Sequence, residues 1–387
     1  MQIIEVKDRK SWKLFHQVPH QIYKDDPNWI CPLEKDVEST FNPKLNKAFA
    51  DGEAVCYVLR EEDGRLLGRI AAFLDYERNK TQPHPLGGIG FFECVPDQAC
   101  AFVMFEKAEA WLREKGARVI EGPVNFGERD KYWGLLVKGF YPPLFQENYN
   151  PPYYRAFFED WGFIPFEQII TFKGDTSNIP VERLGRVAQR LRERYDLKTE
   201  ALDYANLDKY TRDFCEAYNA SFNQFGHFKP MEPEQVASIL MEARSVADPN
   251  IMAMAYYEGK PAGFCAFFPD INPLLKQAKG KLNWRTIPFF LLRRALKKTY
   301  SARGMGFGVH PDYRSKGIFA VLVEFMARPR NRKRYPLMYL TTIRAHNKDA
   351  ISAYENLIIE IDRVHLAYRK PLEKGIVIEP FEFMVDV

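Results

Sequence analysis

The sequence predicts an α/β (α+β) protein that consists of two similar domains, each with a mixed central sheet flanked by helices. Short apolar runs typical of buried strands alternate along the chain with longer runs in which apolar residues recur at helical spacing. This order occurs twice: GFFECVPD (90–97) corresponds to GFGVHPD (306–312), and YYRAFFEDWGF (153–163) corresponds to AISAYENLIIE (350–360). A repeat of this size indicates a duplicated unit. The polar segment GDTSNIP (174–180) separates the two copies, so we expect one domain over 1–175 and a second over 180–387.

The first half contains the elements of one such unit. Ser11 is a suitable N-cap for the first helix, and Gly116 is a suitable stop for the last. EEDG between two β-rich runs is typical of a hairpin. The predicted elements are a strand at 2–6, a helix at 11–23, strands at 54–60, 65–76 and 87–95, a helix at 100–116, a strand at 117–125 and a long aromatic loop at 127–154.

The second half repeats this order after two helices. A hairpin turns at Glu258-Gly259-Lys260 and is followed by a strand, a helix that starts at Gly317, and a second strand–helix–strand unit. The predicted elements are helices at 207–222 and 232–246, a hairpin at 251–269, a strand at 301–311, a helix at 317–329, a strand at 336–345, a helix at 347–357 and a strand at 361–370.

Composition excludes several classes of protein. Charged residues make up 27% and apolar residues 46% of the 387 residues, which excludes disorder, and a net charge of +4 does not indicate a nucleic-acid binder. The six cysteines form no CxxC pair and no zinc-like spacing, so we expect reduced thiols and no metal. The N-terminus lacks a signal-peptide pattern, and no apolar run is long enough to span a membrane. We therefore expect a cytoplasmic protein, with peripheral contact at the inner membrane face left open.

The stretch GVHPDYRSKGIFAVLVEFM (308–326) carries the most chemical information. It predicts a buried strand, a Pro-Asp turn, a short basic segment with one glycine, and an apolar helix. Such a junction directs the unpaired N–H groups and the positive dipole end of the helix outward. A pyrophosphate fits there, with Arg314 and Lys316 adding charge and Gly317 allowing close approach. An ordinary strand-to-helix turn with solvated basic residues is the alternative.

In this context the stretch resembles motif A of the Gcn5-related N-acetyltransferases, the GNAT family. The motif is a strand ending in V-x-P-x-x-[QR]-x-x-G-x-[GA], matched here by Val309, Pro311, Arg314 and Gly317. This sequence departs from it at Phe319, where the family has Gly or Ala.

The second family signature, N-x-x-A-x-x-x-Y-E, follows after the next strand. It is matched by Asn347, Ala350, Tyr354 and Glu355. The usual Gly-Phe after this helix is replaced by Ile358 and Ile359.

The resemblance implies an acyl-coenzyme A site in the second half. In the family two central strands splay apart, so the backbone near Val309 would hold pantetheine. The pyrophosphate would lie against Arg314, Ser315, Lys316, Gly317, Ile318 and Phe319. Tyr354 occupies the place of the acid that protonates the departing thiolate, unless it is a core aromatic. Asn347 would cap its helix, contact the cofactor, or do both.

The base that accepts the amine proton is less evident. His310 precedes the turn on the central strand, and a histidine with a pKa near ~6.5 suits this task, although a structural role is the alternative. His227, Glu216 and Glu242 are further candidates.

The first half lacks this site. Alignment of Pro96-Asp97 with Pro311-Asp312 places Ala99 opposite Arg314 and Phe102 opposite Gly317. The first half therefore resembles a degenerate copy, which would pack against the second half or form one wall of the acceptor site.

The whole chain also resembles a bacterial group of tandem GNAT proteins, some linked to N-acylation of sphingoid bases. The resemblance implies an N-acyltransferase that moves an acetyl or longer acyl group from acyl-coenzyme A to a primary amine, either a small molecule or a lipid, by direct attack. A non-catalytic acyl-coenzyme A sensor or scaffold is the alternative. We expect no specific nucleic acid partner, although the basic cluster ARPRNRKRYP (327–336) leaves RNA contact as a further alternative.

An insertion, NWRTIPFFLLRRALKKTYSARG (283–304), has an apolar middle and basic flanks. Two interpretations stay open: a helix that lies in an anionic membrane interface, or a helix that covers the sheet with its basic residues solvated.

Overall fold

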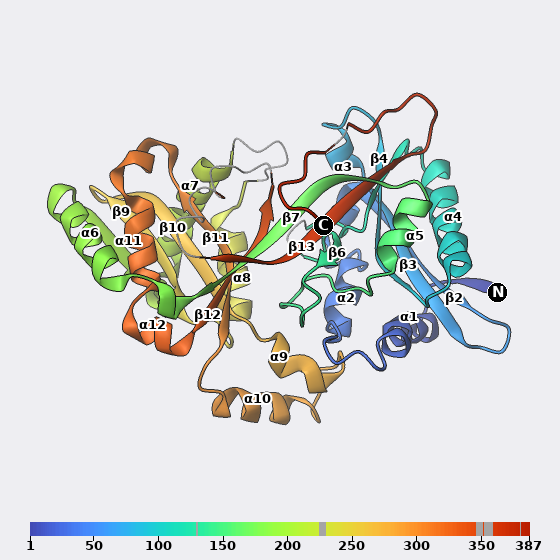
Figure 1. Ribbon diagram of the computed structural model, residues 1–387, viewed down its shortest axis with the longest axis horizontal. Helices are drawn as coiled ribbons and strands as arrows, with labels where there is room; N and C mark the ends of the chain where they lie inside the picture. Colours follow the sequence, from blue (N-terminus) through green and yellow to red (C-terminus); the bar gives the residue numbers. More distant parts are fainter. Residues whose placement is uncertain (129–130, 224–229, 346–350, 352–358, 380) are drawn as a thin grey trace.

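A computed structural model of the chain describes residues 1–387 except 129–130, 224–229, 346–350, 352–358 and 380. Its described strands form one mixed 13-stranded sheet with helices on its faces (Figure 1). The elements of the first half are β1 (Gln2–Glu5), α1 (Arg9–Ile22), α2 (Glu34–Thr40), η1 (Lys47–Asp51), β2 (Gly52–Arg60), β3 (Leu66–Asp75), α3 (Tyr76–Asn79), β4 (Leu86–Cys94), α4 (Gln98–Glu114), β5 (Val119–Gly122), β6 (Leu135–Lys138), α5 (Tyr154–Asp160) and β7 (Ile164–Asp175).

The second half repeats the order of the first. Its elements are η2 (Thr176–Asn178), α6 (Val181–Arg194), β8 (Leu197–Ala201), η3 (Tyr204–Asn206), α7 (Leu207–Phe222), α8 (Pro233–Ala243), η4 (Pro249–Ile251), β9 (Met252–Tyr257), β10 (Lys260–Pro269), α9 (Asn272–Leu275), η5 (Lys276–Ala278), α10 (Ile287–Leu296), β11 (Ser301–Val309), η6 (Pro311–Lys316), α11 (Ile318–Met326), α12 (Pro329–Arg334), β12 (Leu337–Arg344) and β13 (Glu360–Pro371). The predicted fold class is confirmed.

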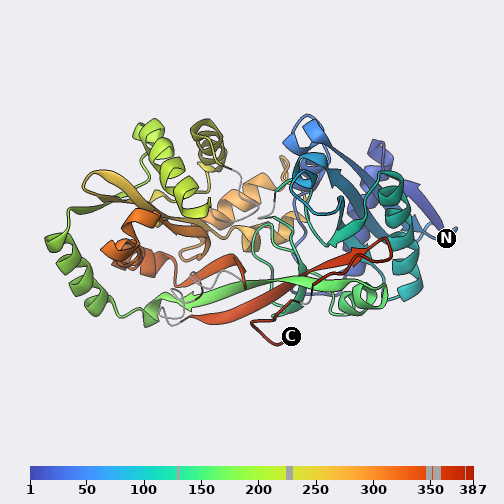
Figure 2. The same ribbon diagram turned by 90° about the horizontal axis from the view of Figure 1, so that it is seen from above.

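The two halves exchange their last strands. β7, which ends the first half, pairs with β12 of the second half, and β13, which ends the second, pairs with β5 of the first. β7 and β13 also pair with each other, antiparallel, from Glu360–Lys173 to Arg369–Ile164. Both strands therefore run from one lobe to the other (Figures 1 and 2). The division into domains 1–175 and 180–387 stays a prediction, but the two halves share one continuous sheet.

Each lobe has its own apolar core. In the first, α4 packs Met104, Phe105 and Leu112 against β2 and β3. In the second, α11 packs Ile318, Val321 and Leu322 against β9 and β10. Burial of each such side chain contributes about 1.5–3 kcal/mol, so these cores hold the central strands and the start of each helix in place.

The first helix differs from its prediction at its N-terminus. Asp8 is the N-cap, and its Oδ1 accepts a hydrogen bond from the Ser11 N–H at 2.7 Å. Ser11 occupies the third helical position and returns the bond, since its Oγ accepts from the Asp8 N–H at 3.0 Å. Asp8 and Ser11 thus form a capping box, which gives two terminal N–H groups a hydrogen-bond acceptor. This is why the helix begins after Asp8 and not after Ser11.

All six cysteines are buried free thiols, as expected for reduced residues. Burial raises the pKa of the Cys31 thiol to about 12, so it is not a nucleophile at neutral pH. In the described part of the chain, no helix is both long and apolar enough to cross a bilayer.

Candidate active site

The central strands of the second half part at a defined point. β11 and β12 pair in parallel from Ser301–Leu337 to Gly304–Leu340, where the described ladder ends. β11 continues to Val309 in antiparallel pairing with β10, and β12 continues to Arg344 in pairing with β7. The two strands thus diverge beyond Gly304, as the family resemblance implies for a site that receives pantetheine.

The turn after β11 ends in a left-handed glycine. Gly317 has φ +79°, a conformation that side-chain-bearing residues rarely adopt, and it is the N-cap of α11. A Cβ atom at this position would lie 2.6 Å from Leu191 Cδ1 of α6. Among the residues that the structure describes, no side chain caps the N-terminus of α11. The positive end of the helix dipole is therefore available to an anion.

The basic residues of the turn point in two directions. Arg314 and Ser315 are exposed beside the start of α11. Lys316 instead places its Nζ 5.0 Å from the ring centroid of Tyr195 and 5.3 Å from that of Tyr257. Arg314 is thus exposed at the turn, whereas Lys316 packs against the aromatic pair, and the binding of a phosphate by either residue stays a prediction.

The apolar residues among those predicted to bind the cofactor pack, fully or in part, against the core of the second lobe. Ile318 is fully buried in the core of the second lobe, so its side chain cannot touch a ligand and only its N–H can face one. Phe319 is half-buried, and its ring centroid lies 5.3 Å from that of Phe307 on β11. Val309 is half-buried at the end of β11.

His310 has a structural task in the turn. Its Nδ1 accepts a hydrogen bond from the Asp312 N–H at 3.3 Å, and this caps η6. Its ring centroid lies 5.2 Å from that of Tyr313. These contacts favour the structural alternative, and its role as a base stays a prediction.

Several predicted site residues fall elsewhere. Tyr354, Asn347 and His227 lie outside the described residues. Glu216 on α7 and Glu242 on α8 are both exposed.

The corresponding strands of the first half also diverge, but there the gap is filled. β4 and β5 pair from Leu86–Val119 to Gly88–Glu121, and the Val124 N–H then donates to Ile89 O of β4 at 2.8 Å. The Asp97 carboxylate caps α4 by accepting from the Ala99 N–H at 2.9 Å. Ile89 O at the strand edge and the Ala99 N–H at the helix N-terminus thus have partners within the protein. This supports the prediction that the first half lacks a cofactor site.

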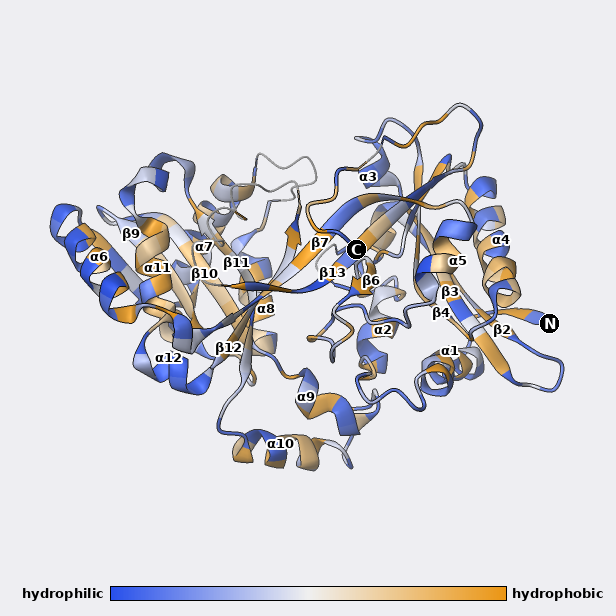
Figure 3. Cartoon of the chain, in the orientation of Figure 1, coloured by the Kyte–Doolittle hydropathy of each residue, from blue (hydrophilic) through white to orange (hydrophobic). Residues whose placement is uncertain are grey.

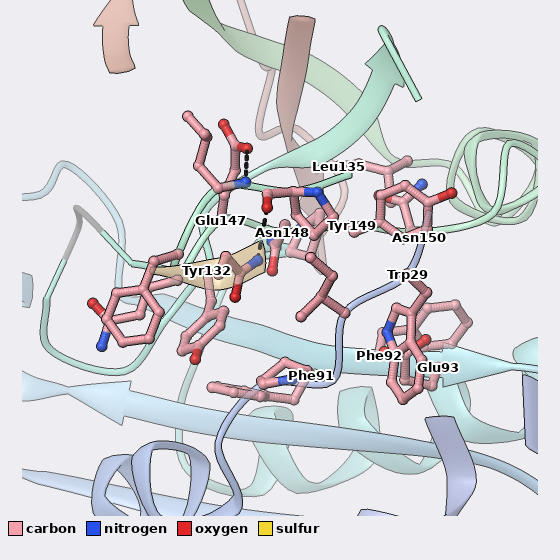
Figure 4. A pocket seen from close by; sticks show the side chains of 18 of the residues that line it. Trp29, Phe91, Phe92, Glu93, Tyr132, Leu135, Glu147, Asn148, Tyr149 and Asn150 are labelled. Carbon is pink, nitrogen blue, oxygen red and sulfur yellow. Dashed lines mark hydrogen bonds between the residues drawn. The ribbon is translucent and has the colours of Figure 1, made fainter. Parts of the chain in front are cut away.

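A buried carboxylate lies in that filled gap. Glu93 accepts hydrogen bonds from the hydroxyls of Tyr23 at 2.7 Å and Tyr154 at 2.9 Å, and Arg69 lies 3.4 Å away. Burial raises the pKa of Glu93, although these three partners oppose the change. Only about 60 Å³ of cavity remains, lined by Trp29 and other aromatic residues (Figure 4).

A larger pocket of about 310 Å³ lies where the two halves meet. Its lining includes Tyr141, Asp270, Tyr339, Asp362 and Arg363. Burial raises the pKa of Asp270 to about 6, and its Oδ1 accepts from the N–H groups of Phe145 and Asn272, both at 3.2 Å. Sequence reasoning missed these residues, because no motif links positions so far apart in the chain.

Comparison with known proteins agrees with this geometry. A model of the acetyltransferase (GNAT) family matches residues 211–357. Among solved structures, the chain resembles a tandem GNAT protein from the clavulanic acid biosynthesis pathway, with a TM-score of 0.54, 12% identity, and coverage of 97% of this chain and 100% of that one. The match to the GNAT family model is confined to residues 211–357, and the fold of the whole chain is that of the tandem GNAT protein.

Two curated proteins are similar over most of their length. Bacterial ceramide synthase of Caulobacter vibrioides (strain NA1000 / CB15N) is 28% identical over 326 residues, which cover 81% of this chain and 82% of that protein. Protein YghO of Escherichia coli (strain K12) is 22% identical over 377 residues, which cover 94% of this chain and 94% of that protein.

Proposed function

We propose that the protein transfers an acyl group from acyl-coenzyme A to a primary amine. One contrast carries the proposal: the α11 N-terminus at Gly317 has no side-chain cap beside diverging strands, whereas Asp97 and Val124 fill the same places in the first half. An anionic cosubstrate therefore fits the second half and not the first.

The residues of the turn have distinct tasks in this proposal. Arg314 and the first N–H groups of α11 hold the pyrophosphate, and the backbone of β11 toward Val309 aligns the pantetheine arm. The amine nitrogen attacks the thioester carbon, an amide bond forms and the carbon–sulfur bond breaks. The sulfur leaves as thiolate and takes a proton from Tyr354, while a base takes the proton of the amine. Such proton transfers contribute about 10²–10⁴-fold to the rate.

We further propose that the acceptor is a long-chain amphipathic amine of the sphingoid class. Support comes from the similarity to a protein named bacterial ceramide synthase over four-fifths of both chains. A ceramide is the amide of a sphingoid amine and a fatty acid, so the acyl group would also be long.

A paired turnover assay tests both the proposed acyl transfer and the proposed long-chain amine acceptor. Release of coenzyme A is followed with acetyl- or palmitoyl-coenzyme A, each with a polyamine or with sphinganine. We expect turnover with palmitoyl-coenzyme A and sphinganine. Turnover confined to acetyl-coenzyme A and the polyamine would contradict the lipid acceptor, and binding without turnover in any combination would contradict the enzyme and favour a sensor or scaffold.

Arg314→Ala is expected to weaken coenzyme A binding by about 1.5–3 kcal/mol, roughly tenfold to a hundredfold, through loss of a charge-assisted contact. The readout is the rise in melting temperature on adding coenzyme A, which depends on affinity by mass action. Arg328→Ala is the matched control, because Arg328 is an exposed arginine beyond the other end of α11. Equal binding by the Arg314→Ala variant and wild type would remove Arg314 from the site.

Tyr354→Phe is expected to lower kcat and leave coenzyme A affinity near that of wild type. The substitution keeps the ring and removes the proton that the thiolate needs. Steady-state rates with a competent amine, with calorimetry of coenzyme A binding, separate these effects. An unchanged kcat would make Tyr354 a packing residue.

A further inference from the structure

The segment between β10 and β11 is an insertion that lies at the edge of the molecule, and α10 is its outermost helix (Figure 1). None of the residues of α10 is buried. Phe290 is the α10 residue that packs against the core of the second lobe. The prediction of a helix that covers the sheet is therefore not what the structure shows.

The exposed side of α10 is apolar. Residues four apart lie on one line of a helix. Ile287, Leu291 and Ala295 form one such line and Pro288, Leu292 and Leu296 form the adjacent one, and all six are exposed. Phe289 extends this surface, with 64% of its area exposed.

The half-buried side of α10 carries its two arginines. Arg293 and Arg294 lie there beside Phe290. A helix at a water-exposed surface ordinarily shows the opposite order, with its apolar stripe inward and its charges outward. The ribbon of α10 carries several hydrophobic residues (Figure 3), and those on its exposed side have no role in the fold that the described contacts reveal.

Trp284 extends the apolar surface just before the helix, with 77% of its area exposed. Arg285 lies over its ring, 4.8 Å from the centroid. Tryptophan is the residue most typical of membrane–water interfaces, because its ring is apolar and its N–H is polar.

The charged residues around α10 indicate what kind of partner covers its apolar surface. From Ile271 to Pro311 the chain contains no Asp or Glu, whereas eight Lys or Arg residues lie between Lys276 and Lys298. Lys281 pairs with Glu34 at 3.4 Å, and Arg293 and Arg294 lie on the half-buried side of α10, but the stretch as a whole keeps a net positive charge. An apolar helix surface flanked by net positive charge complements a membrane with anionic headgroups, where the apolar residues enter the acyl boundary.

We propose that α10 and Trp284 dock the protein on the surface of a membrane that contains anionic lipids. Asp270 and Ser301, at the two ends of the segment that carries α10, both line the pocket between the two halves. The proposal does not depend on acyl transfer, because docking needs no substrate.

Vesicle sedimentation of the full-length protein tests the proposal without any acyl donor or acceptor. The probes are vesicles of phosphatidylcholine alone and of phosphatidylcholine mixed with phosphatidylglycerol. We expect the protein to sediment with the mixed vesicles, to bind phosphatidylcholine alone at least about tenfold less, and to be released by high salt.

The double variant Leu291→Glu/Leu292→Glu is expected to bind the mixed vesicles at least about tenfold more weakly. Both residues are exposed, so their replacement leaves the fold intact, which circular dichroism verifies. The matched control is Ile239→Glu/Met241→Glu, which places two glutamates on exposed apolar positions of α8 and is expected to bind like wild type.

Three outcomes would overturn the proposal. The first is absence of wild-type binding to the mixed vesicles, and the second is equal binding by the α10 variant and wild type. The third is a dimer in light scattering that the α10 variant dissociates, together with no vesicle binding, because a second copy of the chain would then cover the helix. In all three cases the proposed acyl transfer would be unaffected.

Discussion

Replacement of Arg363 by methionine is expected to lower the free energy of unfolding by about 3–5 kcal/mol, because it removes the guanidinium that pairs with two carboxylates, of which Asp362 keeps a second cation in Lys173 at 3.7 Å. Arg363 lies on β13, the strand that crosses between the lobes. Its guanidinium contacts Glu147 at 2.6 Å and Asp362 at 2.6 Å, and its side chain is 3% exposed. Burial alone would raise the pKa of Glu147, but Arg363 holds it below its ordinary value. Urea unfolding measures the loss.

Arg155→Met is the matched control for this substitution. Arg155 pairs with Glu159 one helical turn away at 2.8 Å, and both side chains are more than a third exposed. Exposed pairs of this kind contribute about 0.3–0.5 kcal/mol, so the control is expected to be nearly neutral. Similar losses in the two variants would show that β13 is not anchored by its buried ion pair.

Gly317→Val is expected to abolish detectable coenzyme A binding and to destabilise the protein by about 1–3 kcal/mol. Valine is strained at φ +79°, and its Cβ would meet Leu191 at 2.6 Å. Either the turn moves away from α11 or α6 moves away from the turn. In both cases the helix N-terminus and Arg314 no longer face the same point. Calorimetric titration measures the loss of affinity, and urea unfolding measures the loss of stability.

Gly185→Ala separates the site from a general effect of glycine replacement. Gly185 lies in α6, and a Cβ at this position would meet no atom within 4 Å. Alanine is expected to stabilise this helix by about 0.5–1 kcal/mol and to leave coenzyme A binding unchanged. Normal coenzyme A affinity in Gly317→Val would contradict the assignment of the turn.

Local sequence patterns were sufficient to predict most elements of the fold. The turn from β11 into α11 is an example, because the order strand, Pro-Asp, basic segment, glycine, apolar helix depends only on neighbouring residues. The duplicated pattern also predicted that β4 and β11 are equivalent. Both strands do diverge from a parallel neighbour, at Gly88 and at Gly304.

The strand exchange could not be predicted in the same way. β7 and β13 both mix apolar and charged residues, so their composition does not reveal whether β5 or β12 is the partner. The ion pair of Arg363 with Glu147 joins residues more than 200 positions apart, and no local pattern relates them.

The role of a helix face is equally hidden from the sequence. The apolar periodicity of α10 shows that the helix is amphipathic, but it does not show that the apolar side faces away from the protein. Likewise, Asp97 and Asp312 are aligned in the repeat, yet Asp97 caps α4, whereas α11 has no side-chain cap. The difference arises because η6 and Gly317 separate Asp312 from the helix that it would cap.

The stoichiometry of coenzyme A binding, measured by isothermal titration calorimetry on the full-length protein, tests the central claim most directly. We expect one site per chain in wild type, and none in Gly317→Val. Two sites per chain, or one site that Gly317→Val retains, would contradict a single cosubstrate site at the α11 N-terminus.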